Sequence, residues 1–213
     1  MRFALLVCVA VVGLQSPALF EDNFANGNDG WKFTDSAAWK IAKHEGVNVL
    51  EQFQQSKYTP AVRSPLNIAL IKDQVVGDFV LEAKALSTGK DNPHRDMCVF
   101  WGYQDPSHFY YCHMAKEADD RANQIFIVNG KDRAKISLTS TKGTAWDDKF
   151  HQIKLTRDVK SGEIAVYWDD MKTPIMTAKD KTFVWGQVGV GSFDDSGMWS
   201  DVKLSGNRAE AKK

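Results

Sequence analysis

Short apolar segments separated by turn residues run along almost the whole chain. Within them apolar and polar side chains tend to alternate with the period of two that marks a β-strand, and none has a convincing helical period. The separators carry turn chemistry, as in Asn129-Gly130 and Ser161-Gly162. Candidate strands are residues 39–41, 47–52, 66–71, 79–86, 97–103, 109–114, 123–128, 135–138, 152–156, 163–169, 174–177, 186–192 and 202–205. This pattern predicts an all-β protein, a two-sheet antiparallel β-sandwich of the jelly-roll type.

The N-terminus differs from the rest of the chain. Arg2 precedes an apolar run over residues 3–14, which is too short to span a bilayer comfortably, and small residues follow it. We interpret residues 1–18 as a secretory signal peptide; the alternative is a buried N-terminal helix or strand. Residues 19–205 are then expected to form one domain and residues 206–213 a frayed tail. The mature protein would be secreted, periplasmic or attached to the cell surface.

The charge balance excludes some partners. Lys plus Arg and Asp plus Glu number 27 each, so the net charge is zero and no overall field favours nucleic acid. Beyond the signal peptide no segment is apolar for long enough to insert into a membrane. We expect a monomer. The chain also lacks a Cys/His spacing for zinc, a phosphate-binding glycine loop and a Gly-x-Ser-x-Gly elbow, and no organic cofactor is expected.

Several motifs together resemble a known superfamily. They are Phe-Glu-Asp-Asn-Phe (20–24), Gly-Trp (30–31), Trp-Lys-Ile (39–41), Val-Asn-Val-Leu (47–50), Asp-Phe-Val-Leu-Glu-Ala (78–83), Gly-Tyr-Gln-Asp-Pro (102–106), Gly-Val-Gly-Ser-Phe-Asp-Asp (189–195) and Asp-Val-Lys-Leu (201–204). The chain resembles the concanavalin A-like lectin/glucanase jelly rolls. It is most similar to the secreted bacterial branch with laminin-G-like and 3-keto-disaccharide hydrolase-type domains. Because the superfamily contains hydrolases, lyases and binding modules, the resemblance implies the fold and a carbohydrate ligand but not the chemistry.

The same resemblance implies a structural Ca²⁺ ion. Members of the superfamily often hold one on the convex side, between the first and last strands. Asp22 and Asp201 occupy the matching places, and carboxylate oxygens suit Ca²⁺. The alternative is that both are solvated surface acids.

Residues 94–115 form the most unusual segment, a predicted β-hairpin. Asp105-Pro106 suits a turn, and a four-residue loop over 104–107 would place Tyr103 opposite His108. A five-residue loop would instead place Cys98 opposite Cys112 and allow a disulfide. We prefer the four-residue loop because it gives one apolar face and one face rich in functional groups. It predicts that both cysteines are unpaired and lie on opposite faces.

In the preferred register, functional groups gather on one face of the hairpin. We expect this face to belong to the concave sheet, where the superfamily binds glycans. Asp96 would orient an imidazole, and Tyr111 or His113 would transfer a proton. The catalytic candidates are His94, Asp96, Tyr111 and His113. The alternative is that His and Tyr are merely tolerated on an exposed strand.

Other residues could bind the substrate. Phe100 could stack against a sugar ring, and Asn123, Gln124 and Arg133 could hold a uronate carboxylate. Arg95 belongs to the same group but ranks lower because it points to the opposite face.

These residue types favour an enzyme that cleaves a polysaccharide or a modified disaccharide, as a lyase or a hydrolase. The alternatives are a non-catalytic glycan-binding module and an extracellular structural or adhesive domain. Asp96 is the only acid that the sequence places near the histidines, which disfavours a two-carboxylate retaining mechanism. The Glu-x-Asp-x-x-Glu strand motif is also absent. Asp194 and Asp195 are most simply explained by turn chemistry.

Overall fold

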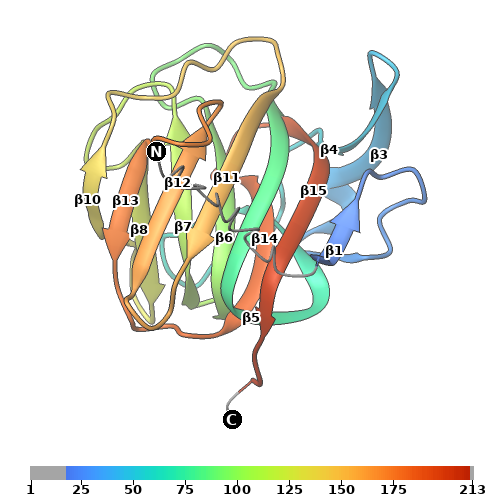
Figure 1. Cartoon of the computed structure of the whole chain (residues 1–213). Helices are drawn as coiled ribbons and strands as arrows, with labels where there is room; N and C mark the ends of the chain where they lie inside the picture. The colour runs from blue at the N-terminus through green and yellow to red at the C-terminus, as the bar shows by residue number, and fades with distance from the viewer. Residues whose placement is uncertain (1–17, 212–213) are drawn as a thin grey trace, which may run out of the picture.

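A computed structural model describes residues 18–211, in which fifteen strands and one short 3₁₀ helix follow one another (Figure 1). The elements are β1 (Ala18–Asp22), β2 (Trp31–Phe33), η1 (Ser36–Ala38), β3 (Trp39–His44), β4 (Val47–Gln52), β5 (Asn67–Ser87), β6 (Asp96–Asp105), β7 (His108–Ala115), β8 (Gln124–Asn129), β9 (Ala134–Lys135), β10 (Ser137–Ser140), β11 (His151–Arg157), β12 (Glu163–Trp168), β13 (Met176–Lys179), β14 (Gly186–Ser192) and β15 (Gly197–Arg208). The predicted signal peptide lies outside the described residues, except for Ala18. In the part of the chain that is described, no helix has the length and apolarity needed to cross a membrane.

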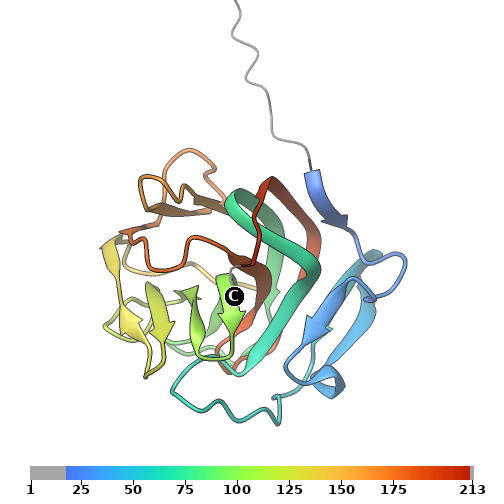
Figure 2. The same ribbon diagram turned by 90° about the horizontal axis from the view of Figure 1, so that it is seen from below.

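The long strand β5 connects the two layers of the sandwich. Its first half pairs with β2 and β14, and its second half pairs with β11 and β15. One layer therefore runs from β5 through β14, β6, β7 and β8 to β9, and the other from β5 through β11, β12 and β13 to β10. Figure 2 shows the layers from below. The sequence predicted two strands, 66–71 and 79–86, where the structure has this one; the all-β sandwich itself is confirmed.

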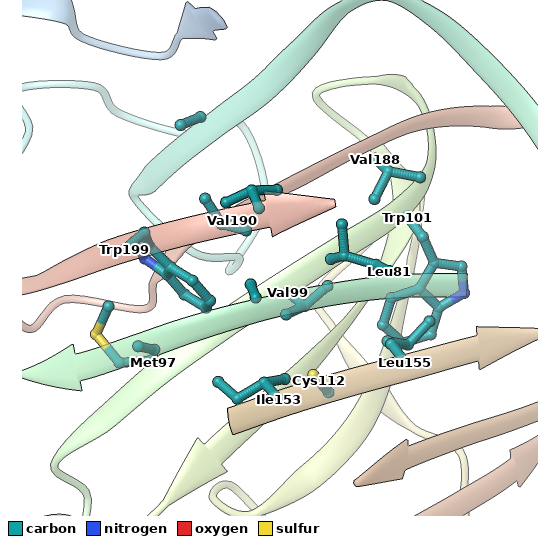
Figure 3. Close-up of a cluster of buried hydrophobic side chains, with 14 of the residues drawn as sticks. Leu81, Met97, Val99, Trp101, Cys112, Ile153, Leu155, Val188, Val190 and Trp199 are labelled. Carbon is teal, nitrogen blue, oxygen red and sulfur yellow. The ribbon is translucent and has the colours of Figure 1, made fainter. Parts of the chain in front are cut away.

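The main core lies between the two layers. Strand alternation sends Val99, Trp101 and Cys112 of the β6–β7 hairpin into it, where they join apolar residues such as Ile153 of β11 and Trp199 of β15 (Figure 3). All five side chains are at most 1% exposed. The apolar face predicted for the hairpin is therefore the core face.

A second apolar cluster covers the opposite face of the same hairpin, which we call the outer face. Its members are Ile68, Leu70, Cys98, Phe100, Phe109, Tyr111, Phe126, Val128 and Phe193. Val62, from the segment 53–66, packs against this cluster. The hairpin is thus buried on both faces, and the expectation of a half-exposed sheet was wrong because side-chain alternation does not show what a distant loop will cover.

The hairpin has the predicted register but a different turn. Val99 lies opposite Cys112, and both cysteines are buried and unpaired, one on each face, as predicted. However, Asp105 pairs with His108, so the turn contains two residues rather than four. A bulge that includes Gly102, at a φ of 56°, takes up the additional residues of β6.

The predicted frayed tail begins too early. Gly206 pairs with Phe79 and Arg208 pairs with Val76, so β15 continues to Arg208. Backbone hydrogen bonds to β5 therefore order the first part of this segment.

Candidate functional site

A polar cavity of about 400 Å³ opens on the outer face near the beginning of β6. Its lining residues come from segments far apart in the sequence: Arg63, Asn92, His94, His113, Arg121, Arg133, Phe193, Asp194 and Asp195. We call it the Asp195 cavity. Three of the predicted site residues, His94, His113 and Arg133, are among these lining residues.

Three carboxylates lie close together at this cavity. One oxygen of each of Asp96, Asp194 and Asp195 lies within 4.8 Å of the others. Asp96 is fully buried, Asp195 is half-buried and Asp194 is exposed. We call these residues the acid trio. Turn chemistry accounted for Asp194 and Asp195 in the sequence, so their place beside Asp96 was missed.

Hydrogen bonds from neighbouring strands fix the segment that carries these acids. Oδ2 of Asp96 accepts from the Phe193 N–H at 2.8 Å, and Oδ2 of Asp195 accepts from the Asp96 N–H at 2.8 Å. On β5, Asn67 Nδ2 donates to Ser192 Oγ at 2.9 Å. The chain that leaves β14 is therefore held against both β5 and β6.

The three carboxyl groups of the acid trio have different pKa values because they differ in burial and lie close to one another. Burial raises the pKa of Asp195 to about 6, and the neighbouring charges of Asp96 and Asp194 add to this effect. Burial and the charge of Asp96 likewise raise the pKa of Asp194. For Asp96, burial opposes ionisation, but the His113 imidazole and the Phe193 amide outweigh it and lower the pKa. The cavity thus keeps one carboxylate ionised beside two that resist ionisation.

His113 is not free to transfer a proton to a substrate. Its Nδ1 lies 3.0 Å from the carbonyl oxygen of Arg121, and since a carbonyl only accepts, this nitrogen carries the proton. Its Nε2 is buried, has no hydrogen-bond partner and lies 3.5 Å from Oδ2 of Asp96. The pairing of Asp96 with an imidazole was predicted, but the proposed catalytic role of His113 does not fit this geometry.

Tyr111 and Phe100 do not reach the cavity surface. Both are fully buried, and their rings stack with centroids 6.1 Å apart. The Tyr111 hydroxyl accepts a hydrogen bond from Arg133 at 2.7 Å, and burial raises its pKa well above the ordinary value. Tyr111 therefore positions Arg133, whereas the predictions that Tyr111 transfers a proton and that Phe100 stacks on a sugar do not fit their burial.

Arg133 is the predicted substrate-binding residue that the structure places in the cavity. Its guanidinium carbon lies 4.4 Å from the ring centroid of Phe193 and 4.5 Å from that of Phe126. His94 also lines the cavity, and its Nε2 lies 2.8 Å from Oδ2 of Asp119. These contacts orient both side chains at the rim.

The remaining candidates have structural roles. Asn123 donates to the carbonyl oxygen of Thr141 at 3.0 Å, and Gln124 donates to that of Asp119 at 2.9 Å. Arg95 is buried, and its guanidinium donates to backbone carbonyls, including that of Ser87. In this geometry backbone carbonyls engage amide and guanidinium donors that a substrate carboxylate would need.

Three further lining residues, Arg63, Arg121 and Phe193, were not predicted from the sequence. Arg63 lies in the segment 53–66, which crosses the outer face, and Phe193 directly precedes the acid pair. The usable signal was two consecutive acids directly after a buried, glycine-rich strand. Its meaning depends on β14 lying beside β6, which strand order along the chain does not reveal.

The two acids predicted to bind calcium line a different cavity, of about 440 Å³, between β1 and β15. Asp22 lies opposite Val202 in the strand pairing, next to Asp201. The carboxylate of Asp22 accepts hydrogen bonds from the Phe24 N–H at 2.7 Å and from Trp31 Nε1 at 2.9 Å. These bonds orient the carboxylate and leave further lone pairs for an ion.

The oxygen atoms at this cavity suit a calcium ion, but Lys84 already pairs with one of the carboxylates. Asn23 and Asn26 add amide oxygens to the two carboxylates, which makes a hard donor set. However, Asp201 forms an ion pair with Lys84 at 2.9 Å, so a calcium ion would have to compete with that ammonium group. The residues fit Ca²⁺, and the calcium site stays a prediction.

Chelation should show whether calcium binds there. An ion that binds only the folded state at a hundredfold excess over its Kd adds about 2.7 kcal/mol of stability. We therefore expect EDTA to lower the Tm by several degrees and added Ca²⁺ to restore it. Asp22→Asn should remove this response, and Asp29→Asn, an exposed acid outside the cavity, should keep it. An unchanged Tm would mean that Asp22 and Asp201 are solvated surface acids that bind no calcium.

Comparison with known proteins found no relative by sequence: no family model and no curated protein matches the chain. The narrower resemblance to laminin-G-like and 3-keto-disaccharide hydrolase-type domains therefore stays a prediction.

Solved structures do resemble the fold. Domain 4 of AbnA, a GH43 extracellular arabinanase from Geobacillus stearothermophilus in complex with arabinotriose, has a TM-score of 0.59 at 10% identity, covering 92% of this chain and 95% of that chain. The carbohydrate-binding module CBM66 from Bacillus subtilis has a TM-score of 0.57 at 14% identity, with 83% and 95% covered. The metal-free lectin I-B4 from Griffonia simplicifolia has a TM-score of 0.54 at 11% identity, with 88% and 98% covered. At these identities the likeness shows the fold alone, which is a jelly-roll β-sandwich.

Proposed function

We propose that this protein binds a carbohydrate in the Asp195 cavity. The observation that carries the proposal is the convergence of carboxylate and guanidinium groups in one open polar cavity of about 400 Å³. Sugar hydroxyls both donate and accept hydrogen bonds. Asp194 can accept from them, while Arg63 and Arg133 can only donate to them. A cavity with both kinds of group suits a short glycan or the end of a longer one.

The structural neighbours support a carbohydrate ligand by analogy. Among them are a module described as carbohydrate-binding, a lectin and a domain in complex with arabinotriose. Because one fold hosts many functions, this support is weaker than that from the cavity itself. The signal-peptide prediction fits the same proposal, in which a monomer outside the cytosol meets polysaccharide.

Binding fits the geometry better than the lyase mechanism that the residue types favoured. A lyase needs a base and an acid that reach the substrate. Here Nδ1 of His113 donates to a backbone carbonyl, Nε2 is buried 3.5 Å from Asp96, and the buried Tyr111 hydroxyl accepts a hydrogen bond from Arg133. The groups that remain accessible are those that hold a ligand.

Glycoside hydrolysis is the second candidate, and one observation favours it. Retaining glycosidases use two carboxyl groups about 5–5.5 Å apart. The acid trio places oxygens of Asp194 and Asp195 within 4.8 Å of each other, a proximity that was not predicted from the sequence. In this alternative Asp194 and Asp195 would act on the bond, and Asp96, being buried, would only position them.

A binding and cleavage screen tests both candidates. Purified mature protein is run in native gels that contain neutral or uronate-containing polysaccharides, and the same mixtures are assayed for reducing ends and for absorbance near 235 nm. We expect retardation without products. Asp194→Asn should weaken binding at least about tenfold, equivalent to about 1.4 kcal/mol, by removing an exposed acceptor. Asp29→Asn makes the same change of charge outside the cavity and should bind as the wild type does.

The outcomes separate the candidates. No retardation by any polysaccharide, or equal retardation of the Asp194→Asn variant, would overturn the binding proposal. Reducing ends without absorbance at 235 nm would replace it by hydrolysis. Reducing ends with that absorbance would restore the lyase and contradict our interpretation of His113.

A further inference from the structure

A second cavity, of about 390 Å³, opens on the outer face at the end of β6, whereas the Asp195 cavity lies near the beginning of that strand. Its apolar part includes Ile68 and Leu70, which belong to the apolar cluster of the outer face. Two tyrosines from different segments, Tyr58 and Tyr103, also line it, and we call it the tyrosine cavity.

Aromatic rings line this cavity from three segments of the chain. The ring of Tyr103, in β6, stacks on that of Phe109 with centroids 5.2 Å apart and an angle of 29° between the planes. Stacking uses one face of the Tyr103 ring, so the opposite face is available to a ligand. Tyr58, from the segment 53–66, and Phe33, of β2, are half-buried and lie at the same cavity.

The hydroxyls of both cavity tyrosines are without partners. Among the described residues, neither Tyr58 nor Tyr103 has a hydroxyl that forms a hydrogen bond with another protein group. The hydroxyls of Tyr110 and Tyr111, in the same hairpin, both bind side chains. Burial raises the pKa of both cavity tyrosines, so both stay protonated and can donate as well as accept. A partly buried tyrosine hydroxyl usually finds a partner, which here would be a ligand.

Two glutamine side chains add oriented acceptors. Nε2 of Gln104 donates to the carbonyl oxygen of Trp185 at 3.1 Å, and Nε2 of Gln187 donates to that of Ile71 at 3.1 Å. Each bond fixes the amide and leaves its Oε1 as an acceptor. The exposed ammonium group of Lys32 adds a donor. The cavity therefore combines aromatic faces with a small number of positioned polar groups, as small-molecule sites do.

We propose that the tyrosine cavity binds a neutral sugar residue, as a second glycan-binding site. A sugar ring has an apolar C–H face that can stack on an aromatic ring, and hydroxyls at its edge that pair with amide and phenol oxygens. A phosphate or sulfate would need several cations, but Lys32 is the only cationic residue that lines this cavity. The two cavities share no lining residue, so this proposal does not rest on the Asp195 cavity.

The segment 53–66 brings the two cavities within reach of one ligand. Tyr58 lines the tyrosine cavity and Arg63 lines the Asp195 cavity. Five residues separate them, so their Cα atoms lie at most about 18 Å apart. One polysaccharide chain could therefore contact both cavities, and the second contact would strengthen the first through its high effective concentration.

Affinity electrophoresis of variants tests the proposal. Purified mature protein is run in native gels that contain increasing concentrations of arabinan, laminarin or xyloglucan, which are neutral, or of alginate, which is anionic. The retardation gives a Kd, and the Tm of each variant shows whether it is folded. For the neutral polysaccharide that binds, we expect Tyr58→Ala and Tyr103→Leu each to weaken binding at least about tenfold. Phe53→Ala removes an exposed ring from the same segment outside both cavities and should bind as the wild type does.

Four results would overturn this proposal. They are the absence of retardation by every neutral polysaccharide, retardation by alginate alone, an unchanged Kd in both tyrosine variants, and an equal loss in Phe53→Ala. Asp194→Asn separates the two sites. If the tyrosine variants alone lose binding, the tyrosine cavity stands and the Asp195 cavity falls; if Asp194→Asn alone loses binding, the reverse holds. Loss in both single variants, with no retardation of the double variant Tyr58→Ala/Asp194→Asn, is the result expected when one chain contacts both cavities.

Discussion

Gly191→Ala should destabilise the protein by at least about 3 kcal/mol or prevent it from folding. A Cβ atom on this residue would lie 1.9 Å from the carbonyl oxygen of Asn67 and 3.1 Å from the Phe100 ring. The obstacle is the backbone of the neighbouring strand, which cannot move aside as a side chain can. The free energy of unfolding, measured by urea denaturation, gives the cost directly.

Gly77→Ala is the matched control. There the nearest atom to the added Cβ is the Val184 carbonyl oxygen at 3.4 Å, an ordinary contact, so we expect a change of less than about 1 kcal/mol. Neither glycine has a positive φ, so the comparison isolates the close approach of strands from backbone strain. Equal stability of the two variants would contradict the close packing of β14 against β5.

The contact at Gly191 also determines the site. It lets β14 lie close to β5, where Asn67 binds Ser192. The chain that leaves β14 then delivers Asp194 and Asp195 to Asp96. A variant that folds with β14 displaced should therefore lose glycan binding, even at temperatures where it remains folded.

Much of the fold could be predicted from the sequence because the evidence for it is local. Alternation and turn residues indicated an all-β sandwich. The hairpin register was predicted by placing Val99 on the apolar face and Cys98 on the face with the functional groups. The sequence did not predict where one strand continues without a break. Nothing local shows that the polar residues after Ile71 belong to one bent strand, β5, rather than to a loop between two.

The candidate site was harder to predict because its parts are distant in sequence. The hairpin supplied Asp96 and His113, which the sequence identified as a pair. Asp194 and Asp195 reach them only through the pairing of β14 with β6, and Arg63 reaches them through a loop that crosses the outer face. A residue type indicates which chemistry is available, but burial decides whether it is used. For this reason Tyr111, which the sequence suggested as a proton donor, is buried in the structure and instead holds Arg133 through a hydrogen bond.

Asp96→Asn should cost about 3–5 kcal/mol in EDTA at pH 7, the usual effect of breaking a buried charge pair. The Asn oxygen can still accept from the Phe193 N–H, but the charge that faces His113 is lost, and a buried amide N–H₂ needs acceptors that the site must supply. Asp119→Asn breaks an exposed pair of the same kind, with His94, and should cost less than about 1 kcal/mol.

The pH dependence of this difference tests its cause. Folding lowers the pKa of Asp96, so its charge stabilises the folded protein above the unfolded value of about 3.9, and this stability is lost as the pH falls through the folded pKa. The gap in unfolding free energy between wild type and Asp96→Asn should therefore shrink below about pH 4, where Asp96 takes up a proton. A gap that stays the same from pH 7 to pH 2 would mean that the substitution acts through packing. Asp96 would then be a buried spacer, and its charge could not be what raises the pKa values of Asp194 and Asp195.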